Sequence, residues 1–218
     1  RHGEEHGGRS SGRGRYTIGR GTLTNSGHVD FHRPNVRTSI YSNGSVTLGG
    51  TGSFTLDNSG NDYIYGYSGE DTLTIGASQT IQGSGFLGVN SSLDIVNNGT
   101  ISANSSTPLQ IVAGGGTLTN GATGVLRAAD GGVLQIGSGT FTSTGTLQQI
   151  GSGQIQLINN VSVLGGTLTG SAIHSVYSTL TNVTDNAGLI LDDGSTTILV
   201  GTVTNNSHIA FASPNFGT

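Results

Sequence analysis

Adjacent carboxylates at Asp192 and Asp193 are the residues whose types are best suited to acid–base chemistry in this 218-residue chain. Cleavage of a glycosidic bond uses paired carboxyl groups, and acidic sugars also require basic partners. The pair lies in a Leu-Asp-Asp-Gly-Ser segment typical of a turn, and Arg127 is the one Lys or Arg after residue 37. This pattern favours a polar turn, and a carbohydrate-active enzyme is kept as the alternative function.

Three further side chains that can ligate metals alternate along one predicted strand, at His28, Asp30 and His32. Residues two apart in a strand are about 6.6 Å apart, whereas bonds from a ligand atom to zinc are near 2 Å. His28 and His32 are twice as far apart again. The spacing therefore disfavours a shared zinc site.

Two consecutive nine-residue segments, 57–65 and 66–74, share the pattern x-x-x-Gly-x-Asp-x-Ile/Leu-x. The pattern resembles the calcium-binding repeats of RTX proteins, in which Gly carbonyls and an Asp carboxylate from adjacent turns hold Ca²⁺. The resemblance implies calcium half-sites at Gly60, Asp62, Gly69 and Asp71. Two Gly-Asp turns that end strands are the alternative, because the pattern is lost in both flanking copies. No other cofactor is expected.

Thr-x-Thr triplets could order water as a flat array, which is the chemistry of an ice-binding surface. They begin at Thr22, Thr72, Thr117, Thr140, Thr167, Thr179 and Thr202. Their uneven spacing of 50, 45, 23, 27, 12 and 23 residues predicts that they are scattered over different faces. Since Thr also favours solvent-facing strand positions, an ice-binding β-solenoid is a minor alternative.

The elements that must position these residues are short strands with period-two alternation of apolar and polar residues, typical of a sheet with one buried face. No window has the apolar spacing of a helix, so the sequence predicts an all-β fold. The clearest strand segments are residues 45–48, 53–56, 72–75, 79–82, 133–136, 154–158 and 196–200.

A turn of the Thr-Asn type recurs along the chain and predicts how the strands are stacked. Its copies begin at Leu23, Val96, Leu118, Phe141, Val183 and Val203, separated by 73, 22, 23, 42 and 20 residues. These separations are close to multiples of 20–24 residues, the repeat of a solenoid. We predict a single-chain parallel β-helix (β-solenoid) of eight to ten coils over residues 16–218. In its turns Asn adopts left-handed backbone conformations, and stacked Asn side chains form ladders.

The composition fits such a stack better than a compact globule, with 39 Gly, 32% hydrophobic and 9% charged residues. Cys, Met, Trp and Lys are absent, which excludes disulfides and thiolate chemistry and fits a durable extracellular protein. No apolar segment is long enough to span a membrane.

Residues 1–15 contain no apolar side chain, so they are predicted to form a flexible Arg/Gly-rich arm. The first 37 residues carry seven Arg against three acids, or +4, and the rest carries one Arg against nine acids, or −8. The Arg-Gly-Arg segment is similar to flexible single-strand binders, but the acidic body would repel phosphate. Nucleic acid is therefore not an expected partner.

Several segments resemble the repeats of large bacterial surface proteins, namely autotransporter passengers and filamentous-haemagglutinin-like adhesins. They include Ile-Val-Asn-Asn-Gly-Thr-Ile-Ser-Ala at 95–103, Gly-Thr-Leu-Thr-Asn at 116–120 and Gly-Thr-Phe-Thr-Ser-Thr-Gly-Thr-Leu at 139–147. The similarity covers about residues 40–210, and it implies a β-helix of the bacterial surface. These families supply no shared catalytic residues.

The expected function is therefore non-catalytic, structural or adhesive, at the bacterial cell surface or in the extracellular matrix. A β-helix has open end coils, and neither predicted end shows a polar cap. We expect either head-to-tail stacking with further copies of the chain or coverage by neighbouring repeats of a longer chain, with surface polysaccharide as a further partner. The residues expected to take part in assembly are Arg9, Arg13, Arg15, Phe211 and Phe216.

Overall fold

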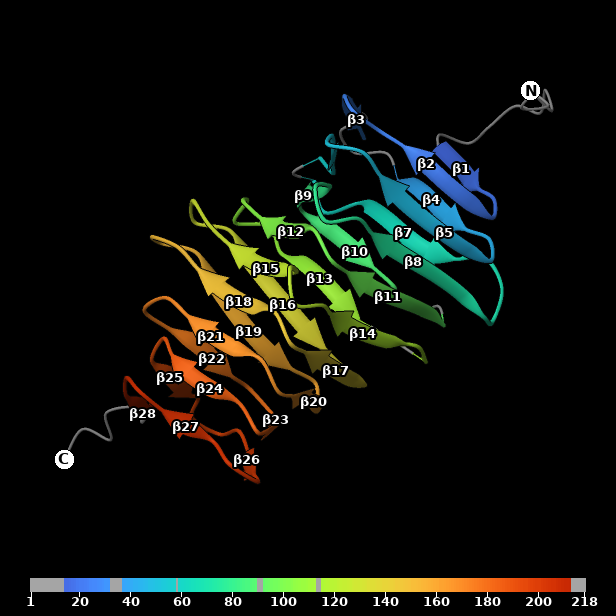
Figure 1. Cartoon of the computed structure of the whole chain (residues 1–218). Helices are drawn as coiled ribbons and strands as arrows, with labels where there is room; N and C mark the ends of the chain where they lie inside the picture. The colour runs from blue at the N-terminus through green and yellow to red at the C-terminus, as the bar shows by residue number, and fades with distance from the viewer. Residues whose placement is uncertain (1–13, 32–36, 58, 90–91, 113–114, 213–218) are drawn as a thin grey trace.

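The computed structural model describes residues 14–31, 37–57, 59–89, 92–112 and 115–212. These residues form 28 short strands and no helix, arranged in three parallel sheets that run the length of the molecule (Figure 1). Consecutive strands go to different sheets, so each strand pairs with the third strand before it and the third strand after it. This is the topology of a β-solenoid.

The three sheets are named A, B and C in the order in which the chain enters them. Sheet A contains β1 (Gly14–Ile18), β4 (Thr38–Ser42), β7 (Asp62–Gly66), β10 (Gly85–Leu87), β13 (Leu109–Val112), β16 (Val133–Gly137), β19 (Gln154–Ile158), β22 (Ile173–Ser175), β25 (Leu189–Leu191) and β28 (Ile209–Phe211). Sheet B contains β2 (Gly21–Thr24), β5 (Ser45–Gly49), β8 (Asp71–Ile75), β11 (Leu93–Asn97), β14 (Thr117–Asn120), β17 (Thr140–Ser143), β20 (Val161–Leu164), β23 (Ser178–Thr181) and β26 (Thr197–Val200). Sheet C contains β3 (His28–Asp30), β6 (Ser53–Thr55), β9 (Thr80–Gly83), β12 (Thr100–Ala103), β15 (Val125–Ala128), β18 (Thr146–Gln149), β21 (Thr167–Thr169), β24 (Thr184–Asn186) and β27 (Thr204–Asn205).

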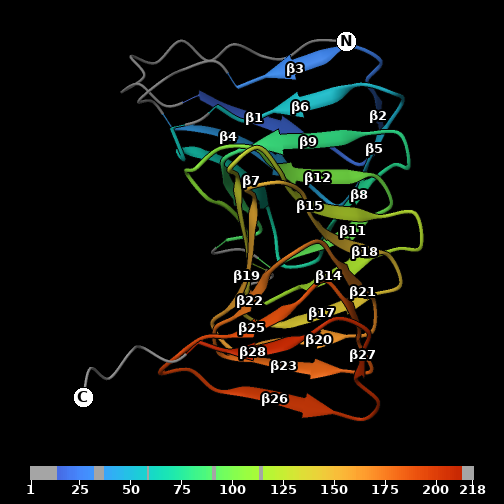
Figure 2. The ribbon, with the colours of Figure 1, turned by 90° about the vertical axis from the view of Figure 1, so that its left-hand side faces the viewer.

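One strand from each sheet makes one turn of the solenoid, so the described residues form nine turns followed by β28. The starts of successive sheet A strands are 24, 24, 23, 24, 24, 21, 19, 16 and 20 residues apart. The mean is about 22, from (209 − 14)/9. The predicted all-β parallel β-helix and its repeat are confirmed. Figure 2 shows the strands of sheet C stacked one above the next from the blue end toward the red end.

The core is a set of residue columns that run along the inside of each sheet. In sheet B one column consists of Val46, Leu73, Ile95, Leu118, Phe141, Val163 and Leu180, each no more than 2% exposed. Period-two alternation places these side chains inward and their neighbours outward. Among the described residues no helix or second layer covers the stack. The inward side chains of each interior turn are therefore covered by the turns on both sides of it.

Asn side chains take both of the parts predicted for them. Asn182, in a Thr-Asn turn, has a φ of 55°, a left-handed conformation that Asn tolerates better than most residues. Asn97 and Asn120 are fully buried register partners, and Asn97 Nδ2 donates to Asn120 Oδ1 at 2.8 Å. The bond lets two adjacent turns place polar side chains in an inward column that also holds Leu48, Ile75 and Ser143.

Candidate functional site

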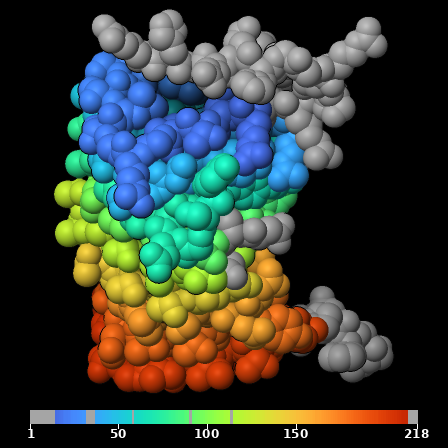
Figure 3. Space-filling view, turned by 90° about the vertical axis from the view of Figure 1, so that its right-hand side faces the viewer, coloured from blue at the N-terminus to red at the C-terminus, as the bar shows by residue number. Residues whose placement is uncertain are grey.

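The turn at the C-terminal end leaves core residues uncovered. In the sheet B column, Leu180 is 0% exposed, whereas its register partner Leu199, one turn later, is 44% exposed. Phe211 on β28 is 80% exposed. No described strand pairs with the outer edges of β26, β27 or β28. Figure 3 shows this last turn, in red, at one end of the stack.

The first turn is open in the same way. Leu23 on β2 is 37% exposed, whereas its register partner Leu48 on β5 is 2% exposed. Tyr16 on β1 is 58% exposed. The outer edges of β1, β2 and β3 have no partner among the described strands. Among the described residues, both ends of the solenoid therefore carry apolar side chains and strand edges without a pairing strand, which one more turn would cover.

A single inward column of sheet A links the two ends. It begins at Tyr16 and ends at Phe211, and it passes through Ile40, Ile64, Leu87, Ile111, Ile136, Leu157, Ser175 and Leu191. A second copy that continued the stack in register would place Tyr16 directly beside Phe211. All strands are parallel, so such a copy would extend sheet A in the same direction, while sheets B and C, which have one strand fewer each, would each lack one strand at the junction.

The charges at the two ends also differ. Arg15 and Arg20 lie on or next to β1 and are exposed. The last two turns contain Asp185, Asp192 and Asp193 and no Arg or Lys. Asp185 is buried and Asp193 is exposed, so their electrostatic contributions differ. Contact between opposite ends of two copies would bring these unlike charges together.

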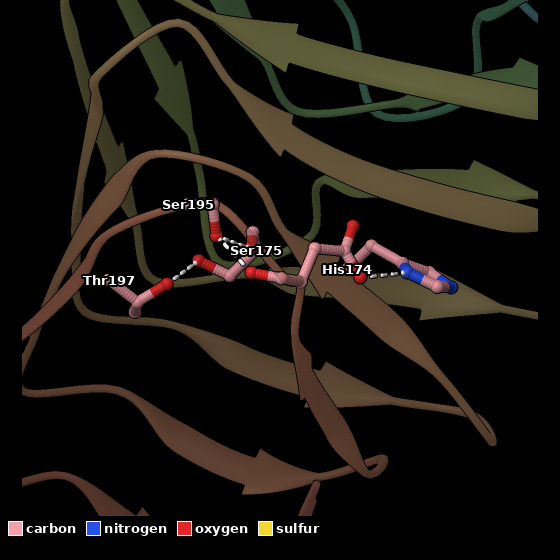
Figure 4. A network of polar contacts seen from close by, with 5 residues as sticks. His174, Ser175, Ser195 and Thr197 are labelled. Atoms are coloured by element: carbon pink, nitrogen blue, oxygen red, sulfur yellow. Dashed lines mark hydrogen bonds and ion pairs between the residues drawn. The ribbon is translucent and has the colours of Figure 1, made fainter. Parts of the chain in front are cut away.

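A polar cluster lies beside the C-terminal end (Figure 4). His174 Nδ1 lies 2.9 Å from Asp192 Oδ1, within hydrogen-bond distance. The hydroxyl of Ser175 forms hydrogen bonds with those of Ser178 and Thr197 at 2.6 and 2.5 Å. This arrangement of His, Asp and Ser is not a nucleophilic triad, because the Ser195 hydroxyl donates to the backbone carbonyl of Asp192 at 2.5 Å and has no described contact with the imidazole.

An open cavity of about 390 Å³ adjoins this cluster and is lined by residues 191–197 with Phe211 and Ala212. Asp192 and Asp193 both line it, so the structure places the predicted acidic pair at a concave surface. Arg127, the predicted basic partner, lies on β15 in the fifth turn, and its Nε donates to Ser102 Oγ at 3.2 Å. The acidic pair follows β25 in the ninth turn. The sequence-predicted carboxylates and cation are thus not brought together.

The predicted calcium residues also lie apart. Asp62 begins β7 in sheet A, and Asp71 begins β8 in sheet B, so the two carboxylates are at different corners of one turn. Burial alone would raise the pKa of Asp71, but backbone N–H groups of Ser68 and Gly44, each 2.5 Å from the carboxylate, hold that pKa below its ordinary value. The Asp71 carboxylate therefore fastens a turn to the preceding one.

The pKa of Asp62 is shifted in the direction opposite to that of Asp71. Burial raises its pKa to about 6, against a partial opposing effect of the Asp57 backbone N–H, which donates to Asp62 Oδ2 at 2.6 Å. The Asp57 carboxylate adds to the increase. Gly60, between Asp57 and Asp62 in the chain, has a φ of 71°. At Gly69 an added Cβ would meet no other atom within 4 Å. No group of three or more His, Asp or Glu side chains is placed to hold a metal within the described ranges.

The remaining sequence-predicted residues are placed as follows. The Arg15 guanidinium lies 4.1 Å from the ring centroid of Tyr41, on the outer face of sheet A. His28 Nδ1 lies 2.8 Å from Ser53 Oγ, on the outer face of sheet C. Arg9, Arg13, His32 and Phe216 lie outside the described residues. Their predicted parts in assembly or metal binding stay predictions.

The outer face of sheet B carries a feature that sequence reasoning missed. Ten of its seventeen outward positions in two columns are Thr. The first column is Ser45, Thr72, Asp94, Thr117, Thr140, Ser162, Thr179 and Ile198, and the second is Thr22, Thr47, Thr74, Val96, Thr119, Thr142, Leu164, Thr181 and Val200. The prediction of scattered triplets is wrong for those at 72, 117, 140 and 179. These triplets are in register on one sheet. Their spacing in the sequence is uneven because the turns of the solenoid differ in length.

Comparisons with protein-family models, with curated proteins and with solved structures found no match. Within the described part of the chain, no helix is long and apolar enough to cross a membrane. The resemblance to bacterial surface repeats therefore rests on the sequence segments that suggested it, and the β-solenoid itself rests on the observed topology.

Proposed function

We propose that this chain is a non-catalytic structural and adhesive protein of the bacterial surface or extracellular matrix, and that its solenoids stack end to end. One observation carries the proposal. Leu180 and Leu199 hold the same register position one turn apart, yet the first is 0% and the second 44% exposed. The molecule ends in an interior that nothing described covers.

The energetics favour covering these ends. Burial of one Leu or Phe side chain contributes about 1.5–3 kcal/mol, and at each end the exposed apolar residues are accompanied by three unpaired strand edges. The two end faces differ from each other, so contact between them is heterologous. Such a contact does not close on itself and produces an open filament.

If this sequence lies within a longer chain, neighbouring turns cover the same two faces, and the stack is one long rod instead of a polymer. Either arrangement gives an extended, repetitive scaffold without a need for catalytic residues. The resemblance to adhesin repeats and the absence of Cys, Met and Trp support an extracellular setting. Surface polysaccharide stays a predicted partner.

Sedimentation velocity of the 218-residue chain, combined with negative-stain electron microscopy, tests the proposal. We expect mass to increase with concentration at low salt and filaments one solenoid wide to form. Leu199→Asp should remain monomeric. Ile150→Asp is the matched control, because Ile150 is 42% exposed but lies away from both ends. A monomeric wild-type chain at high concentration and low salt, or assembly by Leu199→Asp equal to that of the control, contradicts it.

A second candidate, ice binding, is favoured by the Thr columns of sheet B. Strands about 4.8 Å apart and outward residues about 6.6 Å apart form a regular grid of hydroxyl and methyl groups. The assay is inhibition of ice recrystallisation by the intact chain. Thr142→Lys, on this face, should abolish inhibition, whereas Gln135→Lys, on the outer face of sheet A, should leave it unchanged. No inhibition by the wild type, or equal effects of the two variants, removes this candidate.

A further inference from the structure

Four of the six tyrosines lie together at the outer face of sheet A, on and just after the strands β4 and β7. They are Tyr41, Tyr63, Tyr65 and Tyr67. The chain contains no Cys, Met or Trp. Cys and Met are the side chains that oxidise most readily, and Trp competes with Tyr for one-electron oxidation. Tyr is therefore the side chain of this protein that a one-electron oxidant attacks first.

Tyr41 and Tyr67 are the two tyrosines best placed to react with each other. Their ring centroids are 6.3 Å apart and their planes are at 83°, an edge arrangement. The backbone N–H of Tyr67 donates to the carbonyl of Ser42 at 2.8 Å, which fixes Tyr67 to the preceding turn. The Arg15 guanidinium lies 4.1 Å from the ring centroid of Tyr41 and 5.5 Å from that of Tyr67. Tyr67 is 54% exposed, so an oxidant in solution reaches its ring.

The two other tyrosines are less suited to oxidation. Tyr65 is closer to Tyr41, at 5.4 Å between centroids, but it is only 6% exposed and its hydroxyl oxygen accepts a hydrogen bond from Arg37. Burial raises the pKa of Tyr65 to about 12, which opposes the loss of its phenolic proton. Tyr63 is stacked between Tyr65 and Phe86, with centroids 5.0 and 4.7 Å away. Proximity and reactivity thus point to different partners for Tyr41.

We propose that Tyr41 and Tyr67 form an oxidative cross-linking site, at which a haem peroxidase supplied with hydrogen peroxide joins the two rings. Each phenol loses one electron and one proton. The two phenoxyl radicals then combine through a carbon–carbon bond between the ring carbons next to their hydroxyl groups, and the hydrogens of those carbons move to the oxygens. The two electrons and two protons that are lost reduce one hydrogen peroxide to two waters.

The product is a covalent bond between the second and third turns, beside the open first turn. It closes the chain segment between residues 41 and 67 and so restricts the unfolded state, as a disulfide does in proteins that contain Cys. This modification goes beyond the proposed scaffold function. It does not depend on end-to-end assembly, so either proposal can fail alone.

Oxidation of the intact chain tests the site, at a protein concentration low enough to keep the chain monomeric. After treatment with a haem peroxidase and hydrogen peroxide we expect dityrosine fluorescence, an intact mass lower by two hydrogen atoms and a monomer band on a denaturing gel. A protease that cleaves before Asp cuts the denatured chain at Asp57 and Asp62. These cuts separate Tyr41 from Tyr67, so joined fragments identify the cross-link. We also expect the cross-linked monomer to have a Tm several degrees above that of the untreated chain.

Tyr67→Phe should abolish the joined fragments and the rise in Tm. Tyr177→Phe is the matched control, because Tyr177 is 44% exposed and follows β22 in the eighth turn. Tyr65→Phe should also leave the product unchanged. The proposal is overturned if the wild type forms no joined fragments or only covalent dimers, if Tyr67→Phe retains the joined fragments, if either other variant loses them, or if the cross-linked chain has an unchanged Tm.

Discussion

The interior turns and the end turns of this solenoid contain the same kinds of residue at the same register positions, but they bury them to very different extents. Leu180 in the eighth turn is 0% exposed, and its register partner Leu199 in the ninth turn is 44% exposed. Leu48 and Leu23 show the same contrast at the other end. Position along the stack, and not residue type, decides what is buried. A core built from successive turns is complete only where a turn has neighbours on both sides.

The largest expected effect is a matched pair of phenylalanine substitutions. Phe141→Ala removes a fully buried ring and should lower the free energy of unfolding by about 3–5 kcal/mol. Phe211→Ala should lower that of the monomer by well under about 1 kcal/mol, because its ring is already in solvent. Urea denaturation, at a protein concentration low enough to keep the chain monomeric, measures both changes in the free energy of unfolding. Similar losses for the two variants would break the comparison between interior and end turns.

The buried carboxyl group of Asp62, in an interior turn, provides a second test of the difference between interior and end turns. The pKa of Asp62 in the folded chain is raised to about 6 by burial, above its ordinary value of 3.8, so folding favours the protonated form. Its contribution to stability is therefore full below about pH 4 and is lost as the pH rises through 6. At 1.36 kcal/mol per pKa unit the loss is up to about 3 kcal/mol.

Asp62→Asn should accordingly be more stable than the wild type at pH 7.5 in EDTA and should show no difference near pH 4. Asp193→Asn, in the exposed turn of the last complete coil, should match the wild type at both values. Thermal unfolding across this pH range measures the effect. A wild type that is most stable at pH 7.5, with Asp62→Asn less stable there, would show that the buried carboxylate is stabilised in some other way.

The sequence was enough to predict the fold because its signals are local and repeated. The alternation of Thr72 to Ile75 marks a strand with one buried face, and the recurring Thr-Asn turn marks the repeat. Asn182 and Asn120 adopt the backbone and ladder arrangements that their chemistry suggested. Stacking of a repeat needs no long-range information beyond the repeat itself.

The surface features were less predictable, because they depend on how unequal turns come into register. Thr117 and Thr140 are 23 residues apart and Thr72 and Thr117 are 45 apart, yet all lie in one column. Thr38 and Asp62 are 24 residues apart and begin adjacent strands of sheet A, a pairing that depends on the length of the turn between them. The number of residues between two positions predicts whether they share a column only when every turn has the same length.

The central claim is that one molecule continues the stack of the next, with Tyr16 of one copy beside Phe211 of another. The chain contains no Cys, so a Tyr16→Cys, Phe211→Cys double variant treated with a short bis-maleimide reports this contact alone. Neighbouring strands about 4.8 Å apart place the two thiols within its reach. We predict a ladder of covalent oligomers on a denaturing gel, absent from either single variant beyond the dimer. Monomer alone, under conditions where the wild type sediments as a polymer, would contradict in-register end-to-end stacking.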